Sequence, residues 1–205
     1  MINLYNEDCM IAMAGFADNQ FDLAIVDPPY GIGMAGGKRG NSKTDFKNFA
    51  GNDESIPQPE YYEQLIRVSK NYIVWGGNYM TEYLPPKPCF IVWDKVQPQD
   101  FTMAMAELAI TSFNSPAKIF KQRIVGANKN GKIHPTQKPV KLYEWLLMNY
   151  AKEGDKILDT HLGSGSIAIA CHNLGYDLTG YEIDTEYYQA AIKRLKQHQA
   201  QIRMF

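Results

Sequence analysis

The C-terminal quarter of the chain contains a strand–turn–helix–strand pattern that few folds accommodate. Residues 156–159 form a short apolar run typical of a buried strand, and Gly163 and Gly165 follow it as a turn. Residues 167–174 then predict an apolar helix, and residues 177–181 predict a second strand. A glycine turn between a strand and a helix predicts the nucleotide-binding βαβ unit of a Rossmann-like parallel sheet.

Acidic residues narrow the choice of ligand for this βαβ unit. The run Gly163-Ser-Gly165-Ser-Ile-Ala168 also fits the G-x-G-x-x-A pattern of dinucleotide-binding proteins, with Glu182 near the distance expected for the ribose-binding acid. Asp159 argues against a dinucleotide, because a carboxylate that faces the first glycine would repel a pyrophosphate. The same carboxylate suits a ligand that carries an amino group and a sulfonium.

A second buried strand is predicted at residues 23–26, and it stops at Asp27-Pro28-Pro29-Tyr30. Proline cannot donate a hydrogen bond to a neighbouring strand, so the pair ends the strand and leaves nearby carbonyls free to accept. The result is a rigid group of acceptors beside a flat ring, which suits the amino group of a nucleobase. The alternative is structural: Asp27 caps a turn, and Tyr30 packs on its neighbours.

Three features of the chain resemble one enzyme family. Asp-Pro-Pro-Tyr at a strand end resembles the catalytic motif of the amino-methyltransferases, which methylate adenine N6 or cytosine N4 in DNA. The run His134-Pro-Thr-Gln-Lys-Pro139, before a helix predicted at residues 140–150, resembles the segment that lies against the methionine end of S-adenosylmethionine in that family. The catalytic motif comes first and the glycine turn near the end, which resembles the order in the β group of the family.

This resemblance implies a mechanism and a set of site residues. Asp27 and a proline carbonyl would accept hydrogen bonds from the target amine, and Tyr30 would stack on a base flipped out of the duplex. The implied catalytic residues are Asp27, Pro28, Pro29 and Tyr30. The implied S-adenosylmethionine-binding residues are Asp8, Asp27, Thr136, Gln137, Lys138, Asp159, Gly163, Ser164, Gly165 and Glu182.

Two of these positions leave alternatives. Asp8 lies at a strand-to-helix turn, where aspartate commonly serves as a helix N-cap, whereas an acid after the first strand often contacts the cofactor adenine in the resembled family. Thr160-His161 stands where that family usually has Pro-Phe, so the packing of the cofactor there is open. Aspartate at the first position of the catalytic motif favours adenine in the family, whereas serine is usual for cytosine N4.

Positive charge gathers in two segments of the chain. No acidic residue lies between Glu107 and Glu144, whereas seven lysine and arginine residues do. Because the chain has no room for a separate target-recognition domain, we expect basic loops at about residues 31–56 and 113–133 to hold DNA. The expected DNA-binding residues are Lys38, Arg39, Lys43, Lys118, Lys121 and Arg123. The alternative is a solvated charged surface without a partner.

Composition indicates a single domain in a reducing compartment. A chain of 205 residues, 45% of them hydrophobic, can bury one full core. Cys9, Cys89 and Cys171 show no paired spacing, which argues against a disulfide framework or a zinc site, and no metal is expected. The sequence shows neither a membrane-length apolar stretch nor a signal-peptide pattern, so we expect a cytoplasmic protein without a membrane partner.

The expected fold is α/β: a Rossmann-like S-adenosylmethionine-dependent methyltransferase fold with a mixed, mostly parallel seven-stranded sheet flanked by helices. We expect an antiparallel hairpin at one edge, and the N-terminal strand at residues 2–5 next to the strand that ends at Glu182. The expected activity is methyl transfer to adenine N6 in DNA. The alternatives are cytosine N4 methylation, a catalytically inactive nucleic-acid-binding homologue and an NAD-dependent oxidoreductase. A homodimer, a cognate nuclease and a restriction-modification setting stay open.

Overall fold

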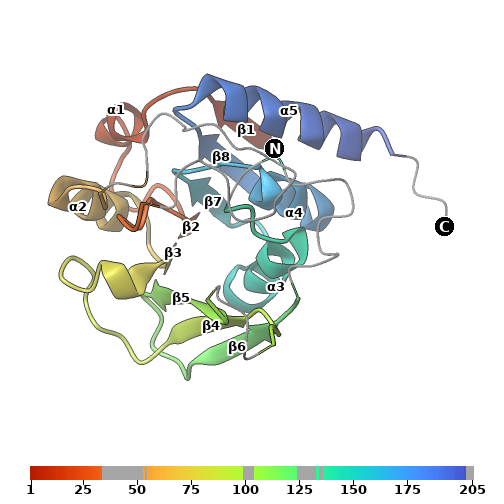
Figure 1. Ribbon diagram of the computed structural model, residues 1–205. Helices are drawn as coiled ribbons and strands as arrows, with labels where there is room; N and C mark the ends of the chain where they lie inside the picture. Colours follow the sequence, from red (N-terminus) through yellow and green to blue (C-terminus); the bar gives the residue numbers. More distant parts are fainter. Residues whose placement is uncertain (34–52, 54, 99–103, 124–132, 134–135, 202–205) are drawn as a thin grey trace.

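The computed structural model describes residues 1–33, 53, 55–98, 104–123, 133 and 136–201. Within these residues, eight strands form one sheet in the order β1-β8-β7-β2-β3-β5-β4-β6 (Figure 1). The strands are β1 (Ile2–Tyr5), β2 (Leu23–Val26), β3 (Tyr72–Trp75), β4 (Phe90–Asp94), β5 (Ala106–Thr111), β6 (Lys118–Lys121), β7 (Lys156–Asp159) and β8 (Asp177–Tyr181). The α/β class expected from the sequence is confirmed.

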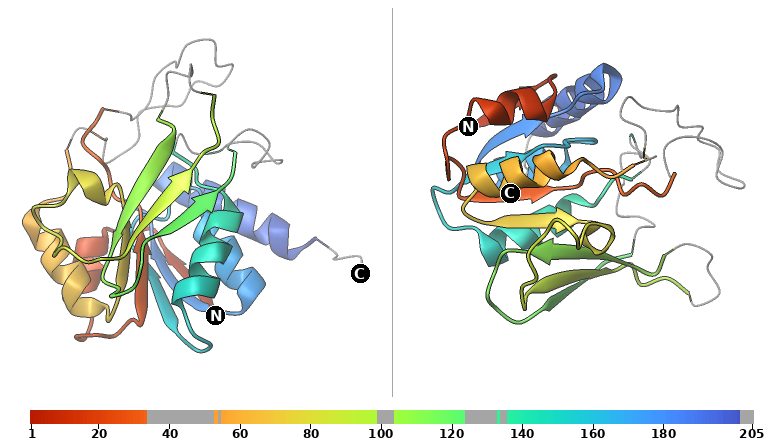
Figure 2. Two further views of the ribbon diagram at one scale, coloured as in Figure 1. Left: turned by 90° about the horizontal axis from the view of Figure 1, so that it is seen from below. Right: turned by 90° about the vertical axis from the view of Figure 1, so that its left-hand side faces the viewer.

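Helices cover both faces of the sheet and give a three-layer structure (Figure 2). One face carries α1 (Cys9–Ala14) and α2 (Pro59–Val68), and the other carries α3 (Val140–Tyr150), α4 (Ser166–Leu174) and α5 (Thr185–Gln199). A short 3-10 helix, η1 (Gly77–Tyr79), follows β3. Among the described residues, none of the helices is long and apolar enough to cross a membrane.

Strand β2 shows how the sequence builds a core on each face of the sheet. All four of its residues are buried. Leu23 and Ile25 pack with residues of α3 and α4, while Ala24 and Val26 pack with residues of α1 and α2. Because successive side chains of a strand point to opposite faces, a continuous apolar run suits a strand that is covered on both faces.

Five strands, β1, β8, β7, β2 and β3, run parallel to one another. Their carboxyl ends therefore meet at one edge of the sheet, which is where open α/β sheets bind their ligands. The Asp-Pro-Pro-Tyr turn after β2 and the glycine turn after β7 both lie at this edge. The pairing of β1 with β8 confirms the expected place of the N-terminal strand.

The expectation of seven strands is wrong by one, and β6 is the strand that the sequence does not reveal. It lies in the segment 113–133, which the sequence predicts as a basic loop. β6 pairs in parallel with β4, and Phe120 packs against the core while Ile119 is exposed. Two lysines frame this four-residue run and hide its alternation. Because β6 occupies the edge, the expected hairpin, β4 and β5, lies one strand inside it.

Candidate active site

Three acidic side chains follow three neighbouring parallel strands. Asp27 comes directly after β2, Asp159 ends β7, and Glu182 comes directly after β8. Burial raises the pKa of Asp159 to about 8, aided by the carboxylates of Asp27 and Glu182 and opposed by a hydrogen bond from the His161 amide. The fold thus joins the two sequence motifs into one strongly acidic edge.

The carboxylate of Asp27 is held from two sides. The Tyr30 hydroxyl donates a hydrogen bond to its Oδ1 at 2.6 Å, and the Lys138 Nζ lies 2.5 Å from its Oδ2. Burial raises the pKa of Asp27, and the charge of Lys138 opposes this rise. A carboxylate has about four acceptor positions, so Asp27 can still accept a hydrogen bond from a substrate amine.

Lys138 brings a second carboxylate to the site. Its Nζ lies 3.1 Å from Oε2 of Glu107 on β5, and Lys95, just after β4, lies 2.6 Å from Oε1 of the same residue. The side chains of Lys138 and Lys95 are both buried. Sequence reasoning missed Glu107 and Lys95, although an acid inside the strand Ala106–Thr111 signals a charge that needs a partner.

Asp53 holds the backbone of the turn that follows β2. Its Oδ1 accepts hydrogen bonds from the amides of Tyr30 and Gly31, at 2.5 and 2.9 Å, and its carbonyl accepts one from Gly33. Pro28 and Pro29 have no amide hydrogen, so the turn depends on the amides that follow them. Asp53 gives no signal in the sequence, because it lies in a segment without apolar periodicity.

The ring of Tyr30 lies between a glycine and a second ring. Gly76, at the end of β3, has a φ of +67°, and a Cβ at this position would overlap the Tyr30 ring. Tyr79 in η1 stacks on Tyr30 with ring centres 5.6 Å apart and an angle of 21° between the rings. Tyr79 is 48% exposed, so an aromatic surface beside Asp27 faces solvent. Sequence reasoning missed Tyr79.

The glycine turn after β7 presents its backbone toward β8. Gly163 and Gly165 have φ angles of +51° and +68°, which favour glycine, and Gly165 is the N-cap of α4. The Gly163 amide donates to Oε2 of Glu182 at 2.7 Å. Ser164 is buried, and its carbonyl accepts a hydrogen bond from Arg194. The predicted strand–glycine turn–helix arrangement is therefore present.

Comparison with known protein families agrees with this geometry. Residues 86–193, more than half of the chain, match the model of the DNA methylase family, N6_N4_Mtase. The chain belongs to the DNA methylase family. It is a DNA methyltransferase, and S-adenosylmethionine is the methyl donor of this family.

Individual relatives carry names of the same kind. The type II methyltransferase M.HpaI of Haemophilus parainfluenzae is 28% identical over 229 residues, which cover 90% of this chain and 71% of M.HpaI. The type II methyltransferase M2.DpnII of Streptococcus pneumoniae is 43% identical over 63 residues, which cover 31% of this chain and 24% of M2.DpnII.

Solved structures share the fold. The M1.HpyAVI–SAM complex has a TM-score of 0.63 and 22% identity, covering 95% of this chain and 100% of the other. The cytosine-N4-specific PvuII DNA methyltransferase has a TM-score of 0.63 and 11% identity, covering 100% of this chain and 88% of the other. At these identities the likeness establishes the fold alone.

The side chains at the acidic edge fit the methyl donor of the family. Among the described residues, no cation forms an ion pair with the buried Asp159, so a positively charged ligand would supply the counter-ion that its ionised form lacks. The side-chain nitrogen of Gln137 is buried and has no hydrogen-bond partner in the described part of the chain, so it can donate to a ligand. The donor would supply a methyl group on a sulfonium. Its predicted contacts with individual residues of this DNA methylase stay predictions.

The pair Thr160-His161 replaces the Pro-Phe that is usual in the family. The Thr160 hydroxyl lies 2.7 Å from the Tyr61 hydroxyl and 2.9 Å from Nδ1 of His161. Burial lowers the pKa of His161 to about 4, so its ring is neutral at physiological pH. A neutral aromatic ring therefore occupies the place of phenylalanine.

The remaining predicted site residues make no contact with Asp27 among those described above. Asp8 is the N-cap of α1, accepting a hydrogen bond from the Met10 amide at 2.9 Å, as the structural alternative predicts. Lys118 and Lys121 lie on β6 rather than in a loop, and Arg123 follows them in an exposed position. Thr136 is exposed. Three predicted DNA-binding residues lie outside the described residues: Lys38, Arg39 and Lys43.

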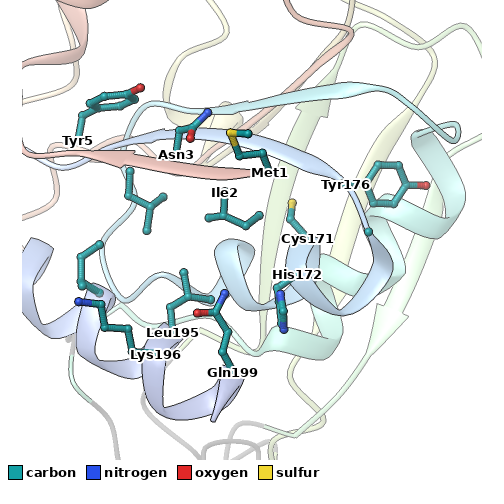
Figure 3. A pocket seen from close by; sticks show the side chains of 13 residues that line it. Met1, Ile2, Asn3, Tyr5, Cys171, His172, Tyr176, Leu195, Lys196 and Gln199 are labelled. Carbon is teal, nitrogen blue, oxygen red and sulfur yellow. The ribbon is translucent and has the colours of Figure 1, made fainter. Parts of the chain in front are cut away.

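A hollow lies away from these residues, between β1, α4 and α5 (Figure 3). Its volume is about 630 Å³, and none of the thirteen residues that line it is acidic. His172 and Lys196 instead give it basic character. A cationic ligand therefore suits the carboxyl edge of the sheet and not this hollow.

Proposed function

We propose that this DNA methyltransferase transfers the methyl group to N6 of adenine. The partly buried Asp27 carries the proposal, because its carboxylate stands at the carboxyl end of β2 and has acceptor positions left for a further hydrogen bond. Aspartate at this position of the motif favours adenine in the family that the sequence resembles. The type II names of the relatives support a restriction-modification setting.

The chemistry follows from the properties of an exocyclic amine. Its lone pair is delocalised into the aromatic ring, which makes the nitrogen a poor nucleophile. When Asp27 and a carbonyl of Pro28 or Pro29 accept its two N–H groups, the lone pair localises on the nitrogen that receives the methyl group. As the N–C bond forms, the bond between sulfur and the methyl group would break, the donor would leave as a neutral thioether, and the nitrogen would release one proton to solvent. No covalent bond to the protein forms.

Two tyrosines offer the surface for the flipped base. Tyr30 and Tyr79 stack on each other beside Asp27, and Tyr79 is the more exposed of the two. Removing a base from the duplex costs a few kcal/mol, which contacts in the pocket must return. We infer that the base stacks against this pair of rings while Asp27 receives its amino group.

Binding of the methyl donor belongs to the acidic edge. We infer that Glu182 accepts hydrogen bonds from ribose hydroxyls, Asp159 faces the positive charge, and the backbone at Gly163 and Gly165 packs on the donor. Gln137 would donate to its carboxylate. DNA would lie along the basic segments at residues 31–56 and 113–133.

Mass spectrometry of methylated DNA tests the proposal. Unmethylated genomic DNA is incubated with the protein and S-adenosylmethionine carrying an isotopic label on the methyl group, then digested to nucleosides. We expect labelled N6-methyladenine, absent with Asp27→Ala and retained with Asp22→Asn, a matched change at a residue that pairs with Lys70. Labelled N4-methylcytosine would overturn the choice of adenine, and an unlabelled digest would overturn the activity.

A further inference from the structure

The ammonium of Lys138 is buried and lies close to three side-chain oxygen atoms. Lys138 is 2% exposed, and its Nζ lies 2.5 Å from Asp27, 3.1 Å from Glu107 and 3.1 Å from the Tyr30 hydroxyl. Of these three contacts, the one to the Tyr30 hydroxyl is a hydrogen bond, and the two to the carboxylates are ion pairs. Lys138 therefore connects the catalytic carboxylate to a second carboxylate on another strand.

The backbone carbonyl and the ammonium of Lys138 have further contacts. The Ser166 hydroxyl, at the start of α4, donates to the Lys138 carbonyl at 2.7 Å. The Nζ lies 5.3 Å from the centre of the Trp75 ring and 5.6 Å from the centre of the Tyr30 ring. These distances suit cation–π attraction. The ammonium therefore has little freedom to leave the carboxylate of Asp27.

Four charges alternate in sign along this path: Lys95, Glu107, Lys138 and Asp27. Burying ion pairs costs desolvation free energy that their attraction seldom exceeds, so such a chain is weak evidence for stability. A functional reason for the chain is the state of Asp27, because an ionised carboxylate only accepts hydrogen bonds, whereas a protonated carboxyl also donates one.

On the basis of the proposed function, we propose that Lys138 and Glu107 are positioning residues: Lys138 keeps the Asp27 carboxylate ionised and oriented toward the target amine, and Glu107 holds the Lys138 ammonium in place. Neither residue needs to touch the base. This role differs from the contact with the methyl donor that the sequence motif implies for Lys138.

The electrostatics give the two residues opposite effects on Asp27. Burial raises the pKa of Asp27, Lys138 lowers it, and Glu107 raises it. Burial opposes the charge of Lys138, but Asp27 and Glu107 together raise its pKa. The other titratable groups that act on Asp27 or sense its charge are Tyr30, Tyr143 and Asp159. Removing the lysine charge and removing the glutamate charge should therefore move the titration of Asp27 in opposite directions.

The test compares Lys138→Met with Glu107→Gln, which each remove one charge; glutamine matches glutamate in length, and methionine is one atom shorter than lysine. The pH dependence of kcat for methyl transfer is measured with saturating S-adenosylmethionine. An opposite charge within about 6 Å shifts a pKa by about 1 to 3 units, so Lys138→Met should move the acidic limb upward by about that amount. Glu107→Gln should move it downward. Lys70→Met, which removes a charge paired with Asp22, should leave the limb in place.

A second measurement does not depend on activity. Carbon-13 NMR of protein labelled at aspartate carboxyls follows the titration of Asp27, assigned by its absence in Asp27→Asn. The same opposite shifts are expected. The positioning role would be overturned if the wild-type enzyme is active and both variants keep its pH profile for kcat and its titration of the Asp27 carbon-13 signal. A wild type that titrates as expected but methylates no DNA would overturn the proposed function instead.

The Michaelis constant for S-adenosylmethionine separates positioning from contact with the donor. Positioning predicts a loss in kcat at neutral pH with the KM for the donor within a few-fold. A KM raised tenfold or more, with kcat restored at saturation, would return Lys138 to the donor-binding set and overturn the proposal. Should Lys138→Met fail to fold, Glu107→Gln carries the test, because a downward shift cannot arise from general loosening of the site.

Discussion

Asp159→Asn should stabilise the free protein at neutral and alkaline pH while impairing its binding of the methyl donor. Asp159 is 2% exposed, and burial raises its pKa to about 8 from an ordinary value of 3.8. Between these values the folded protein holds a proton that the unfolded chain has released. Stability therefore falls as pH rises through this window, and asparagine removes the dependence.

The size of the effect follows from the displacement of the pKa. Each pH unit between the two values costs about 1.4 kcal/mol, so one group with this shift removes about 4 kcal/mol between pH 5 and pH 9. The asparagine side chain of the variant can still accept the hydrogen bond that the His161 amide donates to Oδ1 of Asp159 at 3.0 Å. The difference in the free energy of unfolding between Asp159→Asn and the wild type should therefore grow as the pH rises.

Urea unfolding of both proteins at several pH values between 5 and 9 measures this difference. Asp22→Asn is the matched control, because the Lys156 amide and the Lys70 side chain lower the pKa of Asp22. The contribution of Asp22 is complete above its ordinary pKa, so its loss should lower stability by a constant amount across the range. A difference for Asp159→Asn that is independent of pH would refute the reasoning, since Asp159 would then be ionised throughout.

Two further substitutions test the contact between Gly76 and the Tyr30 ring and the predicted DNA contact of Lys121. Gly76→Ala should lower kcat at least tenfold and leave the affinity for the methyl donor nearly unchanged, because a Cβ at this position overlaps the Tyr30 ring. Steady-state kinetics measures kcat, and calorimetry measures the donor affinity. An unchanged kcat would contradict the close contact between Gly76 and Tyr30. Lys121→Glu should weaken DNA binding equally for all DNA sequences. It should also flatten the slope of log K against log salt concentration by about 0.9 for each phosphate that is no longer neutralised. A changed preference among DNA sequences would instead mean that β6 contacts bases.

The parallel part of the fold is predictable because its signals are local. β2 and β3 are apolar runs that end at turn signals, β1 and β8 alternate apolar and polar residues in part, and α3 begins and ends where the sequence predicts. The glycine turn and the acid at the end of β7 identify the ligand edge by the same local logic. These features need no knowledge of distant partners.

The sequence does not predict β6 or the alternating charges of Lys95, Glu107, Lys138 and Asp27, because the residues that pair there are far apart in the chain. Lys118–Lys121 becomes a strand only by pairing with β4, and Glu107 becomes part of the site only when the fold brings Lys138 against β5. Asp53 holds the catalytic turn across a gap of more than twenty residues. Contacts between residues far apart in sequence therefore need the fold, and the sequence alone does not predict them.

Binding of the methyl donor should release protons, and this follows from the same acidic edge. At pH 7 a carboxyl with a pKa of about 8 is about nine-tenths protonated, so Asp159 holds its proton in the free protein. A cationic ligand favours the ionised form. Calorimetry of S-adenosylmethionine binding in buffers with different ionisation enthalpies should therefore show release of up to about 0.9 proton at pH 7 and much less at pH 9. Affinity should rise with pH until about 8. Asp159→Asn should abolish both effects, whereas Glu107→Gln, whose charge lies beside Lys138, should keep them. Proton release that persists in Asp159→Asn would assign it to another group and remove Asp159 from the donor site.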